Sequence, residues 1–125
     1  MAYHITLITN NSSSSISMTN PANEGDSRLI GPNSTYAPSR PVLINKMNGN
    51  PTYEQALPVA NNIYTLVDNF CFWDNTNSAV NGTGEKGSTI NFNHSAADLQ
   101  ITVDSKGYLN FAVASASAAA SQSAR

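Results

Sequence analysis

Residues 61–77 read Asn-Asn-Ile-Tyr-Thr-Leu-Val-Asp-Asn-Phe-Cys-Phe-Trp-Asp-Asn-Thr-Asn and form the richest local group of large apolar side chains in the chain. They include the single Trp, the single Cys and two of the four Phe. Burial of such side chains is the largest favourable contribution to folding that the sequence offers locally. We therefore expect the rest of the chain to cover this segment.

Side chains in this segment alternate between two sides of an extended backbone. Ile63, Thr65 and Val67 fall on one side, and the aromatic residues after Asn69 continue the alternation. A period of two residues is typical of a β-strand, and β-branched and aromatic residues favour that structure. No Pro or Gly interrupts the segment, so we predict one long central strand, or two strands joined at a bulge near Asp68-Asn69.

Length and composition point to one β domain. The chain has 125 residues, and charged residues make up only 11% of them, well below the usual quarter, whereas Asn and Ser are abundant. We predict an all-β fold, an antiparallel β-sandwich or jelly roll of about seven to nine short strands. Residues 1–113 form this domain, and residues 114–125 form an Ala/Ser-rich C-terminal tail that is flexible or bound to a partner.

Further strands follow from the same alternation. Residues 3–19 read as a hairpin with a serine-rich tip, and residues 99–113 read as a second hairpin around Asp104-Ser105-Lys106-Gly107, whose Gly suits a left-handed turn position. Short strands are also expected at 29–30, at 42–44 and at 88–93. Residues 53–57 fit either a helical turn or an extended run, because Pro residues confine them on both sides.

The inward positions of these strands define the predicted core. It comprises Ile5, Leu7, Ile16, Leu43, Ile63, Leu66, Val67, Phe70, Phe72, Trp73, Ile90, Phe92, Leu99, Ile101, Val103, Leu109, Phe111 and Val113.

One glycine-rich segment matches a nucleotide-binding pattern by its spacing alone. Gly82, Gly84 and Gly87 have the spacing of the dinucleotide fingerprint, but the residues after them alternate like a strand. A dinucleotide site needs a helix N-terminus at the pyrophosphate. We therefore expect a mobile hairpin loop here.

Several function classes are disfavoured. Six Lys and Arg residues are scattered and the net charge is −2, so no basic surface for nucleic acid is expected. No apolar run reaches the roughly 20 residues of a membrane-spanning helix, and the N-terminus lacks the features of a signal peptide. The composition suits an extracellular or particle-surface protein.

Enzyme chemistry is also disfavoured. Neither His4 nor His94 has a carboxylate or thiol partner at metal-ligand spacing. Cys71, between two Phe residues, reads as a small buried hydrophobic residue. We therefore predict a non-enzymatic protein without a metal or another cofactor.

Two short segments resemble a known family. The opening residues 5–12, Ile-Thr-Leu-Ile-Thr-Asn-Asn-Ser, and the triplet Phe72-Trp73-Asp74 are similar to segments of small β-sandwich proteins of the aegerolysin type. The resemblance covers about a quarter of the chain and implies a β-sandwich. The chain lacks the further tryptophans and the second cysteine-bearing segment of that family, so no membership follows.

Two functional hypotheses remain. The first is a structural or self-assembling protein, a subunit of a homo-oligomer, fibre or lattice. Its edge strands and tail would make the subunit contacts, because weak charge does little to keep subunits apart. The tail residues proposed for these contacts are Ala114, Ser115, Ala116, Ser117 and Arg125.

The alternative is a carbohydrate-binding module, lectin-like or toxin-like, that uses the polar Asn/Ser loops. Trp73 could stack on a sugar, and the oxygen-rich residues Asp74, Asn75 and Asn77 follow it directly.

Overall fold

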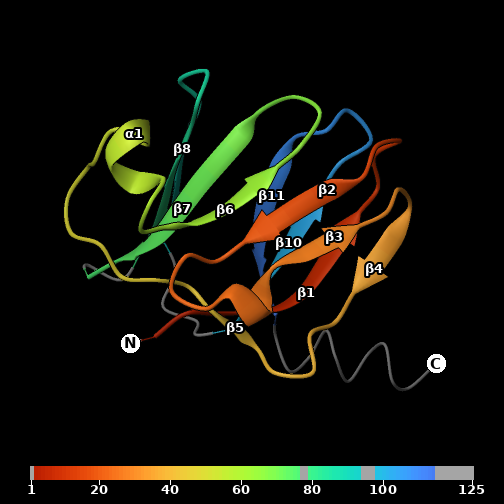
Figure 1. Cartoon of the computed structure of the whole chain (residues 1–125), viewed down its shortest axis with the longest axis horizontal. Coiled ribbons are helices and arrows are strands. Elements are labelled where there is room, and N and C mark those ends of the chain that lie inside the picture. The colour runs from red at the N-terminus through yellow and green to blue at the C-terminus, as the bar shows by residue number, and fades with distance from the viewer. Residues whose placement is uncertain (1, 77–78, 94–97, 115–125) are drawn as a thin grey trace.

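The fold is a β-sandwich of two sheets packed face to face, as the sequence predicted (Figure 1). The computed structural model describes residues 2–76, 79–93 and 98–114. These residues form eleven strands, more than the seven to nine expected, with one short α-helix and one 3₁₀ turn. The sandwich is seen face-on in Figure 1, with the strands of one sheet overlapping those of the other.

Sheet A has five strands in the order β11-β10-β1-β4, and β5 also pairs with β1. Its pairs are antiparallel except for β1 and β10, which run parallel. Its strands are β1 (His4–Asn10), β4 (Ser34–Tyr36), β5 (Val42–Leu43), β10 (Asp98–Val103) and β11 (Leu109–Val113).

Sheet B has six strands, all antiparallel, in the order β3-β2-β6-β7-β8-β9. The jelly-roll strand order stays a prediction. The strands of sheet B are β2 (Ile16–Thr19), β3 (Arg28–Ile30), β6 (Asn61–Tyr64), β7 (Asn69–Asn75), β8 (Ala79–Gly84) and β9 (Thr89–Asn93).

The central apolar segment is a hairpin, so the prediction of one long or bulged strand is wrong. β6 and β7 pair antiparallel across a turn at residues 65–68. Thr65 closes this turn, because its hydroxyl accepts from the backbone N–H groups of Val67 and Asp68, both at 3.2 Å. The sequence did not indicate this turn, because the alternation of side chains continues through residues 63–67 and Thr is also common in strands. Leu66 at the turn is 73% exposed, so it is not a core residue.

The predicted N-terminal hairpin is also wrong, because β1 belongs to sheet A and β2 to sheet B. The chain crosses between the sheets after Asn10, whose buried side-chain amide donates to the carbonyls of Ser14, Ile30 and Gly31. Each strand has its own buried face, so two strands that alternate alike need not pair with each other.

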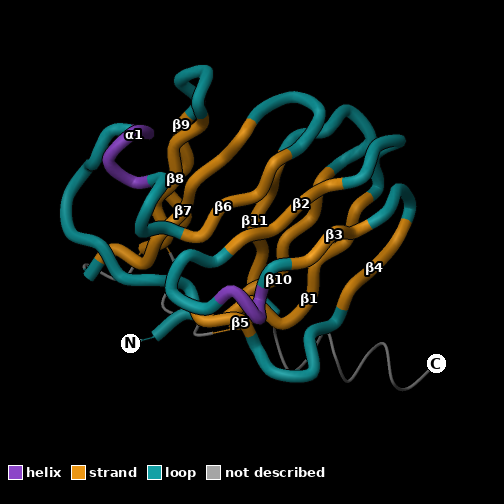
Figure 2. Tube along the Cα trace, in the orientation of Figure 1, coloured by secondary structure: helices purple, strands orange, loops and turns teal. Residues whose placement is uncertain are grey.

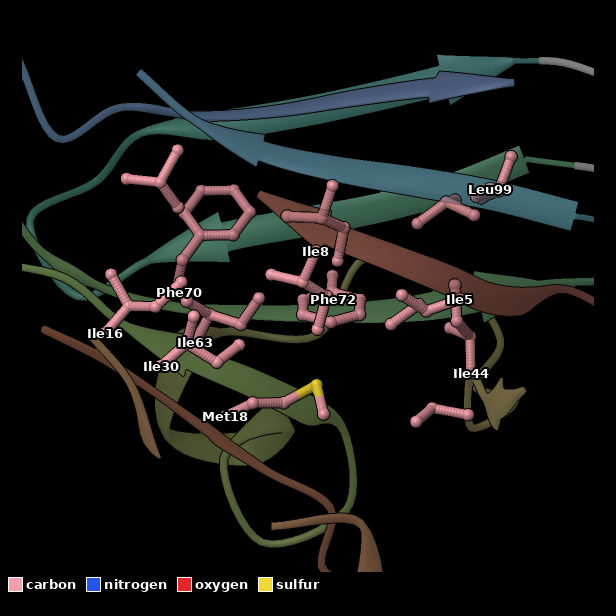
Figure 3. Packing of buried hydrophobic residues seen from close by; sticks show 14 of the residues in the cluster. Ile5, Ile8, Ile16, Met18, Ile30, Ile44, Ile63, Phe70, Phe72 and Leu99 are labelled. Carbon is pink, nitrogen blue, oxygen red and sulfur yellow. The ribbon is translucent and has the colours of Figure 1, made fainter. Parts of the chain in front are cut away.

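The main core lies between the sheets, and Figure 3 shows the side chains of its members meeting there. Most predicted members are in it. A register shift between Ile5 and Leu7 changes which residues of β1 face inward, so Ile8 is buried and Leu7 is only half-buried. Leu43 on β5 is 45% exposed, whereas its neighbours Val42 and Ile44 are buried.

The predicted C-terminal hairpin is confirmed. β10 and β11 pair antiparallel, the N–H of Gly107 donates to the carbonyl of Asp104 (2.9 Å), and Gly107 has the positive φ of +95° that the turn needs.

The glycine-rich segment is partly strand, so the predicted hairpin loop is shorter than expected and begins only after Gly84. Gly82 and Gly84 lie in β8, and the turn follows at residues 85–88. The ring of Phe70 lies so close to Gly82 that a Cβ atom there would overlap it. The two glycines therefore give an aromatic side chain room inside the sandwich, and a strand follows them where a nucleotide site would need a helix.

A loop segment covers part of the outer face of sheet B (Figure 2). It contains α1 (Tyr53–Ala56), which begins with a capping box formed by Thr52 and Gln55, so residues 53–56 are helical. Beneath it lies a second apolar cluster that includes Ala56, Cys71 and Trp73. Trp73 is therefore buried, but outside the main core. The 3₁₀ turn, Glu24–Asp26, lies between β2 and β3.

Candidate functional site

The residues predicted for sugar contact lie in different environments. Trp73 is 2% exposed beneath the α1 segment, so neither face of its ring is open for stacking. Asp74, its neighbour on β7, is buried and points to the opposite side of the sheet. Asn75 is half-buried and donates to the carbonyl of Gly49 at 3.5 Å, and Asn77 lies outside the described residues.

Asp74 is buried, and its backbone is bonded to another part of the chain. Burial raises the pKa of its carboxyl group, while nearby Lys46 and a hydrogen bond from the backbone of Tyr3 lower it in part. Its backbone holds the segment after β5, because its N–H donates to the carbonyl of Asn45 (2.8 Å) and its carbonyl accepts from the N–H of Met47 (3.0 Å). Asp74 thus connects this segment to sheet B.

The first residue of the predicted tail continues the strand pairing. The N–H of Ala114 donates to the carbonyl of Asp98 at 2.9 Å. The other tail residues named above, Ser115, Ala116, Ser117 and Arg125, lie outside the described residues, so the boundary at residue 113 stays a prediction.

One side of the sandwich, which we call the closed side, brings the edge strands β3 and β4 together. The guanidinium of Arg28 on β3 lies 4.4 Å from the ring centroid of Tyr36 on β4. The side chain of Asn10 holds the adjoining loop, because it donates to three carbonyls and accepts from both the N–H (3.0 Å) and the hydroxyl (2.6 Å) of Ser12. The sheet edges on this side are therefore joined by side-chain contacts.

The opposite side, which we call the open edge, consists of β9 at the end of sheet B and β11 at the end of sheet A. The N–H of Gly84 donates to the carbonyl of Ser88. Hydrogen-bonded and non-hydrogen-bonded pairs alternate along an antiparallel ladder. The backbone groups of Thr89, Asn91 and Asn93 therefore point away from β8, beyond the last described strand of sheet B.

The same reasoning applies to β11. The N–H of Asp104 donates to the carbonyl of Tyr108, and the N–H of Ala114 donates to the carbonyl of Asp98. These hydrogen bonds lie at the two ends of the β10–β11 pair, and both give the same alternation of hydrogen-bonded and non-hydrogen-bonded residue pairs. The backbone groups of Leu109, Phe111 and Val113 accordingly point away from β10. Across the open edge, the rings of Phe92 and Phe111 lie with their centroids 6.2 Å apart.

An apolar cavity of about 200 Å³ lies at one end of the open edge. The start of β9, the start of β11 and the turn between β6 and β7 surround it, and its lining includes Val67, Phe70, Ile90 and Leu109. Tyr108 at this cavity is 56% exposed. The cavity could accept one apolar side chain or another small apolar group.

A different groove, of about 310 Å³, lies on the outer face of sheet B. Its floor contains a row of cross-strand neighbours, Trp73, Asn81 and Asn91, from β7, β8 and β9. Asn50 and Pro51, just before α1, line it as well. We refer to it as the outer groove. The alternating polar residues of β8 and β9 indicated this polar face in the sequence. Gly82 and Gly84, however, led to the prediction of a loop where β8 lies.

The thiol of Cys71 is also on the outer face, and it is buried and free. Burial raises its pKa to about 11, so the thiolate that would act as a nucleophile is scarce at neutral pH. Its predicted place as a small buried hydrophobic residue is confirmed.

Within residues 2–76, 79–93 and 98–114, no three His, Cys, Asp or Glu side chains lie together as a metal ion would need. The described helices are all too short to cross a membrane.

Comparison with known proteins identifies no family for this chain. No protein-family model, no curated protein and no solved structure matches the chain.

Proposed function

We propose that this chain is a non-enzymatic structural protein that assembles with copies of itself through the open edge. The observation that carries the proposal is the pair of adjoining edge strands, β9 and β11, whose outward backbone groups pair with no other described strand and can accept a strand from another chain. A free sheet edge readily pairs with an added strand from another chain.

The two sides of the sandwich differ in how their edges are protected. Proteins often protect an edge with a charged side chain or a Pro. On the closed side, β3 carries Arg28, and Pro32 follows shortly after. Neither β9 nor β11 contains a charged residue or a Pro. The open edge is thus the less protected side and the better surface for subunit contact.

The tail extends this proposal. It follows β11 directly, and Ala114 is still bonded to β10, so the chain leaves the described part of the sandwich at the open edge. Most of its remaining residues are Ala or Ser, whose small side chains let two backbones approach closely. We propose that the tail adds to the contact between copies. The formal net charge of −2 opposes that contact only weakly.

A proline substitution tests the outward backbone of β9. Asn93→Pro removes an N–H that points away from β8, so it should prevent pairing with a second copy and leave the ladder to β8 intact. Asn93→Ala is the matched control, because it removes the same side chain and keeps the N–H. Light scattering coupled to size-exclusion chromatography should show a smaller particle for the Pro variant and an unchanged one for the Ala variant.

Deletion of residues 115–125 tests the tail separately and should also reduce the particle mass. Thermal unfolding confirms that each variant is folded. A wild-type chain that remains monomeric at all accessible concentrations would contradict self-association. An unchanged mass after the deletion would restrict the contact to the strands.

A further inference from the structure

Two residues that line the outer groove each have a buried side-chain atom without a hydrogen-bond partner. The indole Nε1 of Trp73, a donor, and the side-chain Oδ1 of Asn81, an acceptor, make no hydrogen bond to any described residue. The two residues face each other across β7 and β8 in the outer-groove row. An unpaired buried polar group costs roughly 1–3 kcal/mol, so a donor and an acceptor left unpaired on two cross-strand neighbours indicate a missing polar partner.

The chemistry of this partner follows from the lining. A hydroxyl group both donates and accepts, so one hydroxyl can satisfy the Asn81 oxygen and the Trp73 N–H together. Thr83 and Asn91 add a hydroxyl and an amide, and Pro51 adds an apolar wall. None of the described residues that line the groove is charged. A neutral ligand with several hydroxyl groups matches these properties better than an anion or a cation.

We propose that the outer groove binds a neutral sugar, with a hydroxyl group of the sugar between the indole N–H of Trp73 and the side-chain oxygen of Asn81. This recognition uses the edge of the indole ring and does not require an exposed ring face. It is also independent of self-association, which uses the backbone of the open edge. The groove volume lies at the small end of the range for small-molecule sites, roughly 300–1,000 Å³, so the ligand is one or two sugar units.

Access to the two atoms requires a small movement of the adjoining turn. Trp73 is 2% exposed, and Asn50 and Pro51 line the groove beside it. These residues belong to the turn before α1, which is held by the long contact from Asn75 to Gly49 (3.5 Å) and by the hydroxyl of Thr76, which donates to Asn48 (3.0 Å). Both contacts are exposed to solvent. Outward movement of this turn would admit the ligand.

The single tryptophan allows a direct test, because fluorescence excited selectively at tryptophan reports on Trp73 alone. We would titrate glucose, galactose, mannose, N-acetylglucosamine and lactose. At least one sugar should give a saturable change with a Kd of about 1 mM or tighter, an affinity suited to a small site. Asn81→Ala should weaken binding about tenfold or more, since one good hydrogen bond contributes about that factor.

Two further variants separate binding from folding. Trp73→Phe keeps an aromatic ring and removes the N–H, and its affinity, measured by calorimetry, should fall as it does in Asn81→Ala. Asn110→Ala, on β11 away from the groove, is the matched control and should bind like wild type, with thermal unfolding measured for each. No saturable signal with any of these sugars, or equal affinity in wild type and Asn81→Ala, would overturn the proposal and leave a trapped water as the partner of these atoms.

Discussion

The closed side and the open edge show two ways to end a β-sheet within one small sandwich. On the closed side, Arg28 and Tyr36 join β3 to β4, and the side chain of Asn10 bonds to five backbone or side-chain groups. At the open edge, β9 and β11 lie next to each other with outward backbone groups and without charged residues. The difference shows that the side chain of Asn10 has a structural role, because it connects the ends of several strands and loops on the closed side.

A second set of asparagines supports this view. Asn20, Asn45 and Asn61 form a buried chain of hydrogen bonds that uses side-chain and backbone groups. Asn45 donates its backbone N–H to Asn61 at 2.7 Å and its side-chain amide to Asn20 at 2.8 Å. The amide of Asn61 in turn donates to the carbonyl of Leu43. These residues join strands and loops of both sheets, so a high Asn content reflects internal structure as well as surface polarity.

The largest expected effect comes from breaking the closed side. Asn10→Ala leaves three carbonyls and two donors without their partner, and it should lower the free energy of unfolding by about 3 kcal/mol. Urea unfolding followed by circular dichroism measures the change. The exposed Asn110→Ala at the open edge is the matched control and should change stability by less than about 0.5 kcal/mol. Equal effects of the two variants would refute the structural difference between the sides.

The second prediction compares one glycine from each half of the molecule. Gly82→Ala places a Cβ against the ring of Phe70, so we expect a loss of about 1–3 kcal/mol from overpacking. Gly31→Ala, near the closed side, meets only the hydroxyl of Ser34 at 3.6 Å and should be neutral or slightly stabilising. Thermal unfolding of both variants gives the comparison. A stable Gly82→Ala variant would show that Phe70 can move into the neighbouring cavity.

A third prediction concerns the α1 segment that covers the outer face of sheet B. Thr52→Ala removes the capping box and should destabilise this short helix by about 1 kcal/mol. Because α1 covers Cys71, the thiol should react with a disulfide reagent about fivefold faster in the variant at pH 8.

The pH dependence of this reaction has a defined sign. With a thiol pKa of about 11, the rate should rise as the pH increases from 7 toward that value, because the thiolate is the reactive form. Thr35→Ala on exposed β4 is the control and should not alter the rate. Rapid labelling of the wild-type chain at neutral pH would show that α1 does not protect Cys71.

The smallest expected effect is at the surface of the closed side. Arg28→Ala removes the contact with the Tyr36 ring and should cost about 0.5 kcal/mol, the usual size for an exposed cation–π pair. Arg40→Ala removes the same charge from another exposed position and corrects for net charge. The difference between the two variants in the urea midpoint of unfolding measures the contribution of the contact between Arg28 and Tyr36. If the two midpoints agree, the closed side is held by hydrogen bonds alone.

The amino-acid sequence by itself determined the all-β class, most of the core and the hairpin at residues 99–113. These follow from an alternation of apolar and polar side chains that is independent of the partner strand, and from a turn whose Gly107 needs a positive φ. Apart from this hairpin, tertiary structure decided which strands pair. β1 and β2 alternate alike yet join different sheets, and Thr65 makes a turn where its β-propensity suggested a strand.

The candidate sites depend on the same distinction. Sequence reasoning selected Trp73 as a large aromatic next to polar residues, but its burial beneath α1 results from contacts between residues far apart in the chain. The pairing of Trp73 with Asn81, and of Asn81 with Asn91, is likewise a matter of strand register. Alternation is a local property of the chain, whereas register and sheet membership depend on how distant segments compete for the same buried surface.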